Sequence, residues 1–142
     1  MKRLVLILSM IGLCLPIWAG IHSYADHSVL KEGKVIKIRV SETGVHCIPY
    51  DTLKAWGLQP EQVRILGYGG NMLSENFLLK KWDDLPSVAF YMHKGSDNTF
   101  NSGDYILFYA RGAVKWEYSG GRWRHTQHPY SLYGYYFVSD SA

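Results

Sequence analysis

Residues 103–109 read Gly-Asp-Tyr-Ile-Leu-Phe-Tyr, which is a turn followed by an uninterrupted apolar segment. The apolar part, 105–110, carries no charged side chain, and the preceding stretch, 95–103, is rich in Gly, Asp, Asn and Ser. A short apolar run that follows such turn formers is typical of a central β-strand. We therefore expect 105–110 to be a strand that is covered on both faces.

Strand patterns continue on the N-terminal side of this segment. Residues 36–40 alternate apolar and basic side chains, and Val88, Phe90 and Met92 alternate with a second set of residues. A turn at 41–44 leads into a strand over 45–48, so these two early strands are expected to form a hairpin. A further strand is expected at 63–66, before the glycine-rich residues 67–70.

One short helix is expected between these strands. Asp51 could accept hydrogen bonds from the first amides of the helix, and Gly57 suits its C-terminal exit. Residues 71–86 lack a clear period and are interpreted as a long connection that is anchored by Trp82 and Leu85.

The C-terminal part predicts a hairpin and a last strand. Two aromatic runs, 116–118 and 122–124, flank Ser-Gly-Gly, so aromatic side chains can pair across the hairpin. The last strand is expected at 133–138. Six to eight short strands with one or two short helices predict a mainly β, antiparallel sandwich or barrel-like domain.

The N-terminus has the features of a secretory signal peptide. Lys2 and Arg3 precede an apolar stretch over 4–15, which is shorter than the roughly 20 residues of a membrane-spanning helix. Cleavage after Ala19 or after Ala25 fits the pattern. We expect residues 1–25 to be the signal peptide, 26–142 to be the mature domain, and the product to be exported.

Charge and cysteine content restrict the function further. The chain has a net charge of +3, and loss of Lys2 and Arg3 leaves 13 basic and 12 acidic residues. This balance does not predict a nucleic-acid partner. Cys47 would be the single cysteine of the mature domain, so no intramolecular disulfide is expected and the core alone must hold the fold.

The motifs that suggest catalysis or a metal are weak. His46 and Cys47 are adjacent on a strand, so their side chains should diverge, and Cys47 is interpreted as a buried structural cysteine. His125 and His128 could bind a metal only on a helix, which Pro129 disfavours.

Two other motifs also receive a structural interpretation. Asp97, Asn101 and Asp104 offer oxygens that suit Ca²⁺, but Ser102 stands where an EF-hand loop needs glycine, so a polar turn is favoured. Residues 67–70 lack the spacing of a phosphate-binding loop. We therefore predict no catalytic residue, no cofactor and no metal, and expect that the chain is not an enzyme by itself.

The aromatic residues of the C-terminal part are the candidate interaction surface. They are Trp116, Tyr118, Trp123 and Tyr130. They could form a platform for stacking sugars, or they could fill the core or an interface with another domain, and we favour the core or interface.

Many short motifs, in order from about residue 28 to 138, resemble the N-terminal region of PorU-type sortases, the gingipain-family (C25) cysteine peptidases of the type IX secretion system. The motifs are Val29-Leu30, Gly33-Lys34, Lys37-Ile38-Arg39-Val40, Thr43-Gly44-Val45, Tyr50-Asp51, Leu53, Gly57, Val63-Arg64-Ile65, Gly67-Tyr68-Gly69-Gly70, Met72-Leu73, Gly103 to Tyr109, Trp116, Tyr130-Ser131 and Tyr133 to Phe137.

The resemblance implies a β-rich, prodomain-like module that precedes a peptidase domain, in an enzyme that removes sorting domains from secreted cargo. The catalytic His and Cys of that family lie downstream of this region, so none is carried over, and we expect a truncated or split product. The partner would be a C25 peptidase domain, in cis or in trans, with other type IX components at the outer membrane. The implied location is the periplasm, outer membrane or cell surface of a Gram-negative bacterium. The alternative is a secreted, aromatic-rich carbohydrate-binding module.

Overall fold

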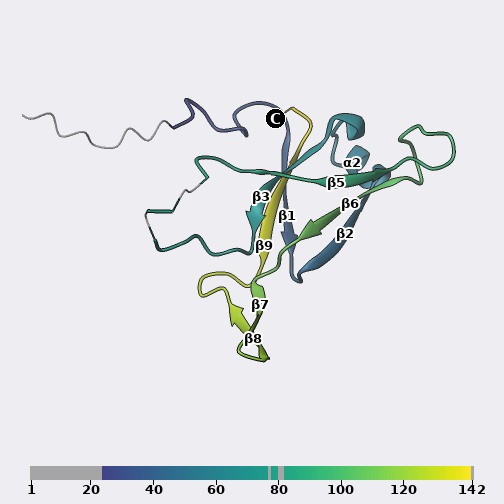
Figure 1. Ribbon diagram of the computed structural model, residues 1–142. Helices are drawn as coiled ribbons and strands as arrows, with labels where there is room; N and C mark the ends of the chain where they lie inside the picture. Colours follow the sequence, from purple (N-terminus) through teal and green to yellow (C-terminus); the bar gives the residue numbers. More distant parts are fainter. Residues whose placement is uncertain (1–23, 77, 80–81, 142) are drawn as a thin grey trace, which may run out of the picture.

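The computed structural model describes residues 24–76, 78–79 and 82–141, and its secondary structure is almost entirely β (Figure 1). The elements follow in the order β1 (Val35–Val40), β2 (Gly44–Pro49), α2 (Tyr50–Ala55), a 3₁₀ turn η1 (Pro60–Gln62), β3 (Arg64–Gly69), β4 (Ser87–Val88), β5 (Phe90–His93), β6 (Tyr105–Ala110), β7 (Val114–Ser119), β8 (Arg122–Gln127) and β9 (Gly134–Ser139). The predicted signal peptide falls almost wholly outside the described residues. Within them, none of the helices has the length and apolar character needed to cross a membrane.

The strands form two antiparallel sheets and one separate hairpin. The larger sheet has the order β1-β9-β3-β4, the smaller one β2-β6-β5, and β7 pairs only with β8. Phe108 of the smaller sheet meets Tyr136 of the larger sheet edge to face, with 5.7 Å between ring centroids. The prediction of a mainly β, antiparallel, sandwich-like domain with short helices is confirmed.

The core lies between the two sheets and is closed at one end by α2. Leu53 of α2 is fully buried, as are Ile65 of β3, Ile106 of β6 and Val138 of β9. Period-two alternation in the strands sends these side chains inward, and the short helix adds one apolar side chain between them.

The expected hairpin of the first two strands is wrong. β1 pairs with β9 in the larger sheet and β2 pairs with β6 in the smaller one, so residues 41–43 cross between the layers. The crossing is fixed by Thr43, whose Oγ1 accepts a hydrogen bond from the Gly112 amide at 3.0 Å. A Cβ at Gly112 would lie 2.6 Å from the Ser41 carbonyl oxygen, so only glycine allows this approach. Residues 41–43 do bend the chain, as the sequence predicts, but they do not close a hairpin, because strand pairing depends on long-range contacts that local sequence does not encode.

The expectation that β6 is covered on both faces is also wrong. Ile106, Phe108 and Ala110 are buried, whereas Tyr109 is 55% exposed and Tyr105 and Leu107 are half-buried. β6 is the central strand of its sheet, as predicted, but its outer face carries apolar side chains that no described element covers.

The N-terminal end of α2 differs from the prediction, whereas its C-terminal end agrees with it. Pro49 occupies the N-cap position without a side-chain cap, and Asp51 instead accepts a hydrogen bond from the Ser102 hydroxyl at 3.0 Å. Gly57, with φ of +73°, ends the helix as expected.

The connection between β3 and β4 is not anchored by Trp82, which is 67% exposed, although Leu85 is half-buried. The attachment comes from hydrogen bonds: the Tyr68 hydroxyl donates to the Asp84 carbonyl at 2.8 Å, and the Gly67 amide donates to the Pro86 carbonyl at 2.9 Å.

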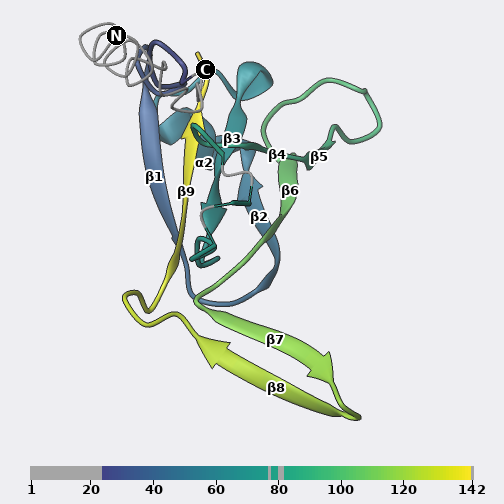
Figure 2. The ribbon, with the colours of Figure 1, turned by 60° about the vertical axis from the view of Figure 1, so that its left-hand side comes forward.

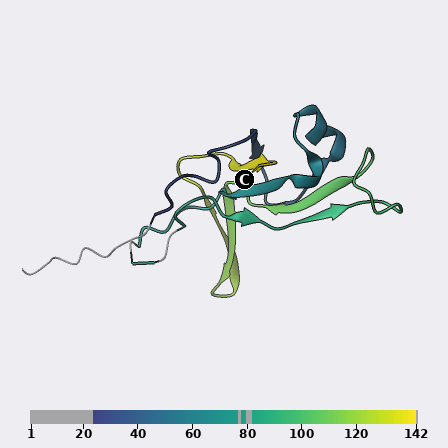
Figure 3. The same cartoon turned by 90° about the horizontal axis from the view of Figure 1, so that it is seen from above.

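The β7–β8 hairpin extends away from the two sheets. In Figure 2 it lies below the sandwich, at the opposite end from the C-terminus, and Figure 3 shows it leaving the body of the domain to one side. It confirms the predicted late hairpin, and its position makes it the most accessible element of the described chain.

Candidate interaction surface

The hairpin has one aromatic face. Its register places Trp116 opposite His125 and Tyr118 opposite Trp123, and positions two apart on a strand point to the same side. The ring centroids are 5.0 Å apart in the first pair and 5.4 Å in the second. We call these four residues the aromatic face of the hairpin.

The rings of this face are open to solvent. Trp116, Tyr118 and Trp123 are 59%, 64% and 66% exposed. The expectation that they could fill the sandwich core is therefore wrong, because the hairpin projects beyond both sheets. The alternative that they contact another domain or a ligand stays a prediction.

The opposite face of the hairpin is charged. Lys115 and Glu117 form an ion pair with 2.6 Å between Nζ and Oε1, and Arg124 lies across from Glu117 in the register. Both partners of the ion pair are more than half exposed, so the pair adds little stability. Its effect is to make the hairpin a two-faced element, aromatic on one side and polar on the other.

Both ends of the hairpin have a defined geometry. Gly120 and Gly121 have φ of +60° and +77°, as a two-residue type I′ turn requires. At the base, the His128 amide donates to the Ala113 carbonyl at 2.7 Å, and the Thr43 hydroxyl donates to the Val114 carbonyl at 3.4 Å. The hairpin is therefore attached to the crossing between the sheets.

Tyr130 does not belong to the aromatic face. It is 90% exposed, and its ring packs edge to face on His128 with 6.2 Å between centroids. The structure thus groups three of the four predicted aromatic residues and separates the fourth. It adds His125, which period-two alternation with Trp123 could have identified.

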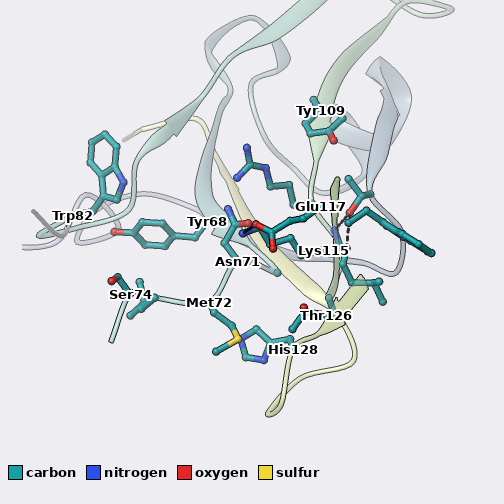
Figure 4. A pocket seen from close by; sticks show the side chains of 18 residues that line it. Tyr68, Asn71, Met72, Ser74, Trp82, Tyr109, Lys115, Glu117, Thr126 and His128 are labelled. Carbon is teal, nitrogen blue, oxygen red and sulfur yellow. Dashed lines mark hydrogen bonds and ion pairs between the residues drawn. The ribbon is translucent and has the colours of Figure 1, made fainter. Parts of the chain in front are cut away.

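An open groove of about 690 Å³ lies between the base of the hairpin and the connection that follows β3 (Figure 4). Its walls carry aromatic and polar side chains, and those labelled in Figure 4 are Tyr68, Asn71, Met72, Ser74, Trp82, Tyr109, Lys115, Glu117, Thr126 and His128. Burial raises the pKa of the Tyr68 hydroxyl, and the nearby carboxylates of Asp84 and Asp83 raise it further. The Tyr68 hydroxyl therefore stays protonated and acts as a hydrogen-bond donor.

His46 and Cys47 do not form a catalytic pair. The His46 ring faces the core side, where it lies 5.9 Å from the Phe108 ring, and its Nε2 is 3.0 Å from the Glu42 carbonyl oxygen. Cys47 points to the outside and is exposed. The predicted divergence is confirmed, but the predicted burial of Cys47 is wrong, because outward positions of this sheet are not covered.

The other motifs form local structure. Within the described part of the chain, no three His, Cys, Asp or Glu side chains gather as a metal site would require. Asp97 accepts hydrogen bonds from the Thr99 amide at 3.0 Å and from the Asn101 side chain at 2.8 Å, which lower its pKa. This is the polar turn that the sequence predicts.

The glycines at the end of β3 permit close packing. A Cβ at Gly69 would lie 2.3 Å from the Tyr136 hydroxyl, and one at Gly70 would lie 2.0 Å from the Gly112 carbonyl oxygen. These glycines therefore bring the end of β3 against the crossing between the sheets.

No family model matches this chain, and no curated protein matches it. A solved structure of dimeric latent PorU from Porphyromonas gingivalis does match, with a TM-score of 0.71 and 36% sequence identity. This chain is similar to a region of PorU.

The similarity covers 84% of this chain and 10% of the PorU chain. The chain thus spans about a tenth of the length of PorU. An identity of 36% over this extent supports relationship to PorU as well as a shared fold. It supports the resemblance to PorU-type proteins that the ordered motifs of the sequence indicate.

Proposed function

We propose that this chain is a non-catalytic, prodomain-like module that docks a C25 peptidase domain of the type IX secretion system. The observation that carries the proposal is the similarity of most of the chain to one tenth of PorU. A region of that size within a much larger polypeptide has neighbouring domains as its natural contacts.

Three structural features support a binding role over a catalytic one. The two strands of the hairpin present three exposed aromatic side chains on one face, and aromatic residues are enriched at protein interfaces. His46 and Cys47 point to opposite faces, so they cannot act as nucleophile and base. The outer face of β6 is apolar and only partly covered.

The proposal includes export. The N-terminal basic and apolar residues would act as a signal peptide, and the mature module would work in the periplasm, at the outer membrane or at the cell surface of a Gram-negative bacterium. The peptidase domain would be contacted in cis or in trans, with other type IX components nearby.

A carbohydrate-binding function is the second candidate. The observation that favours it is the groove of about 690 Å³ beside the hairpin, whose walls combine aromatic rings with hydrogen-bonding side chains. Sugars bind to such surfaces by stacking on rings and by polar contacts.

One experiment separates the two functions. The purified chain is tested for binding to a PorU-type C25 peptidase domain from the same organism and to an array of bacterial surface glycans. Binding to the peptidase domain supports the first proposal. Glycan binding that is lost in Trp116→Ala, which removes a ring that lines the groove, without peptidase binding, would replace it with the second.

A further inference from the structure

The three-stranded sheet has an outer face without charge. The residues that point outward are paired by register: Val45 of β2 lies beside Tyr109 of β6, and Cys47 lies beside Leu107, which is followed by Tyr91 of β5. Val45, Tyr109 and Tyr91 are 68%, 55% and 62% exposed. The first row spans β2 and β6, and the second spans all three strands of the sheet.

A third row extends the same surface. Pro49 of β2, Tyr105 of β6 and His93 of β5 are paired in register, and the Tyr105 and His93 rings stack with centroids 4.6 Å apart. No Asp, Glu, Lys or Arg stands at any outward position of these three rows. We call the three rows the outer sheet face.

The outer face of the larger sheet, by contrast, carries basic side chains. Lys37 lies over the Tyr135 ring at 4.2 Å, and Arg39 lies over the Tyr133 ring at 4.5 Å. Arg64 of β3 is also exposed. On the larger sheet, solvated basic side chains thus cover the outer rings. On the smaller sheet, the outward tyrosine, leucine and valine side chains have no such cover. An extended exposed apolar surface of this kind marks an interaction site.

We infer that the outer sheet face is the surface that packs against the C25 peptidase domain, an inference that rests on the proposed function. An uncharged face selects an uncharged, apolar partner surface, since burying an unpaired charge against it is costly. The aligned region is a tenth of the PorU chain, so this fold occurs there beside a much larger body of the same polypeptide. Two domains of one polypeptide meet at a high effective concentration, which favours their contact through such a face.

The test inserts a charge into the face. Val45→Lys and Tyr91→Lys change exposed positions on two different strands, so the core is left intact. Leu132→Lys is the matched control, because Leu132 is 68% exposed, as Val45 is, and lies outside the face. Binding of each full-length chain to an immobilised PorU-type peptidase domain is measured, with circular dichroism as the check of folding.

A second readout uses Cys47 as a reporter. In a Cys14→Ser background Cys47 is the only thiol of the chain, and it lies in the middle row of the face. Its alkylation by a maleimide is followed in the free chain and in the presence of the peptidase domain. Coverage of the face predicts slower alkylation in the complex, and this readout needs no change in the face itself.

The inference predicts at least about a 100-fold loss of affinity for both face variants, because each would bury an unpaired ammonium group, and little change for Leu132→Lys. Unchanged binding by the face variants, with unprotected Cys47 in the complex, would overturn the inference while leaving the proposed function standing. Failure of the unmodified chain to bind would reject both. A dimer of the chain that Val45→Lys dissociates would assign the face to a second copy and so contradict the inference.

Discussion

The exposed outer sheet face predicts that two adjacent residues of β6 differ sharply in their contribution to stability. Ile106 is fully buried between the sheets, whereas Leu107 is half-buried and points outward. Both residues lie in the same strand and have side chains of the same size. Replacing each by alanine therefore compares the two faces of one sheet with the backbone pairing unchanged.

The expected magnitudes follow from burial. Ile106→Ala removes three buried carbon atoms at about 0.8 kcal/mol each, and the cavity term brings the loss of unfolding free energy to about 3–4 kcal/mol. Leu107→Ala removes atoms that are still partly hydrated and leaves no closed cavity, so about 1 kcal/mol is expected.

Urea unfolding of the purified chain, followed by circular dichroism, measures both values. With a slope of about 1.5 kcal/mol per molar urea, the midpoint should fall by about 2 M for Ile106→Ala and by less than about 1 M for Leu107→Ala. Equal losses would refute the reasoning, because they would mean that the outer face is as well covered in the free chain as the core is.

Three further predictions concern single contacts. The Arg111 amide donates to the Tyr136 hydroxyl at 2.8 Å, so Tyr136→Phe should lower the free energy of unfolding in urea by about 1 kcal/mol; a change under about 0.3 kcal/mol would contradict this contact. Gly70→Ala should cost about 1–3 kcal/mol because its Cβ would meet a backbone carbonyl, whereas Gly44→Ala, with nothing within 4 Å, should be nearly neutral; equal effects would argue against the close approach. The hydrogen bond from the Val29 amide lowers the pKa of Asp84 below its ordinary value of 3.8. This contact therefore stabilises the folded state above pH 3.8, and the stabilisation is lost as the pH falls through the pKa of the folded state. The Val29 amide resonance should therefore titrate with a midpoint below 3.8 and lose this titration in Asp84→Asn; a midpoint at or above 3.8 would contradict the contact.

Local patterns in the sequence predicted most of the strands, because period two and turn residues are properties of neighbouring positions. The segment 105–110 became the central strand β6, and the two aromatic runs around Ser-Gly-Gly became the β7–β8 hairpin. Cross-strand pairing of aromatic rings there was also predicted, since a two-residue turn fixes the register.

Pairing between distant strands could not be predicted in this way. The turn at 41–44 resembles a hairpin turn, yet it crosses between layers, because Thr43 and Gly112 meet across 69 positions of sequence. Likewise, the apolar composition of β6 predicted two covered faces. In the structure only one face is buried, because Tyr105 and Leu107 are half-buried and Tyr109 is exposed on the other.

The candidate surface was predicted in part. Trp116, Tyr118 and Trp123 share one face, but the sequence could not show that the hairpin projects from the sandwich. The outer sheet face was missed entirely. Its members come from three strands that are far apart in the sequence, and each one alone is an ordinary strand residue.

The most direct test of the account is the affinity of the unmodified chain for a PorU-type C25 peptidase domain from the same organism, measured by isothermal titration calorimetry. The account predicts a saturable one-to-one complex with a negative heat-capacity change, as burial of the apolar sheet face requires. Absence of binding at concentrations where the chain stays folded and monomeric would contradict the claim that this PorU-like region is a docking module.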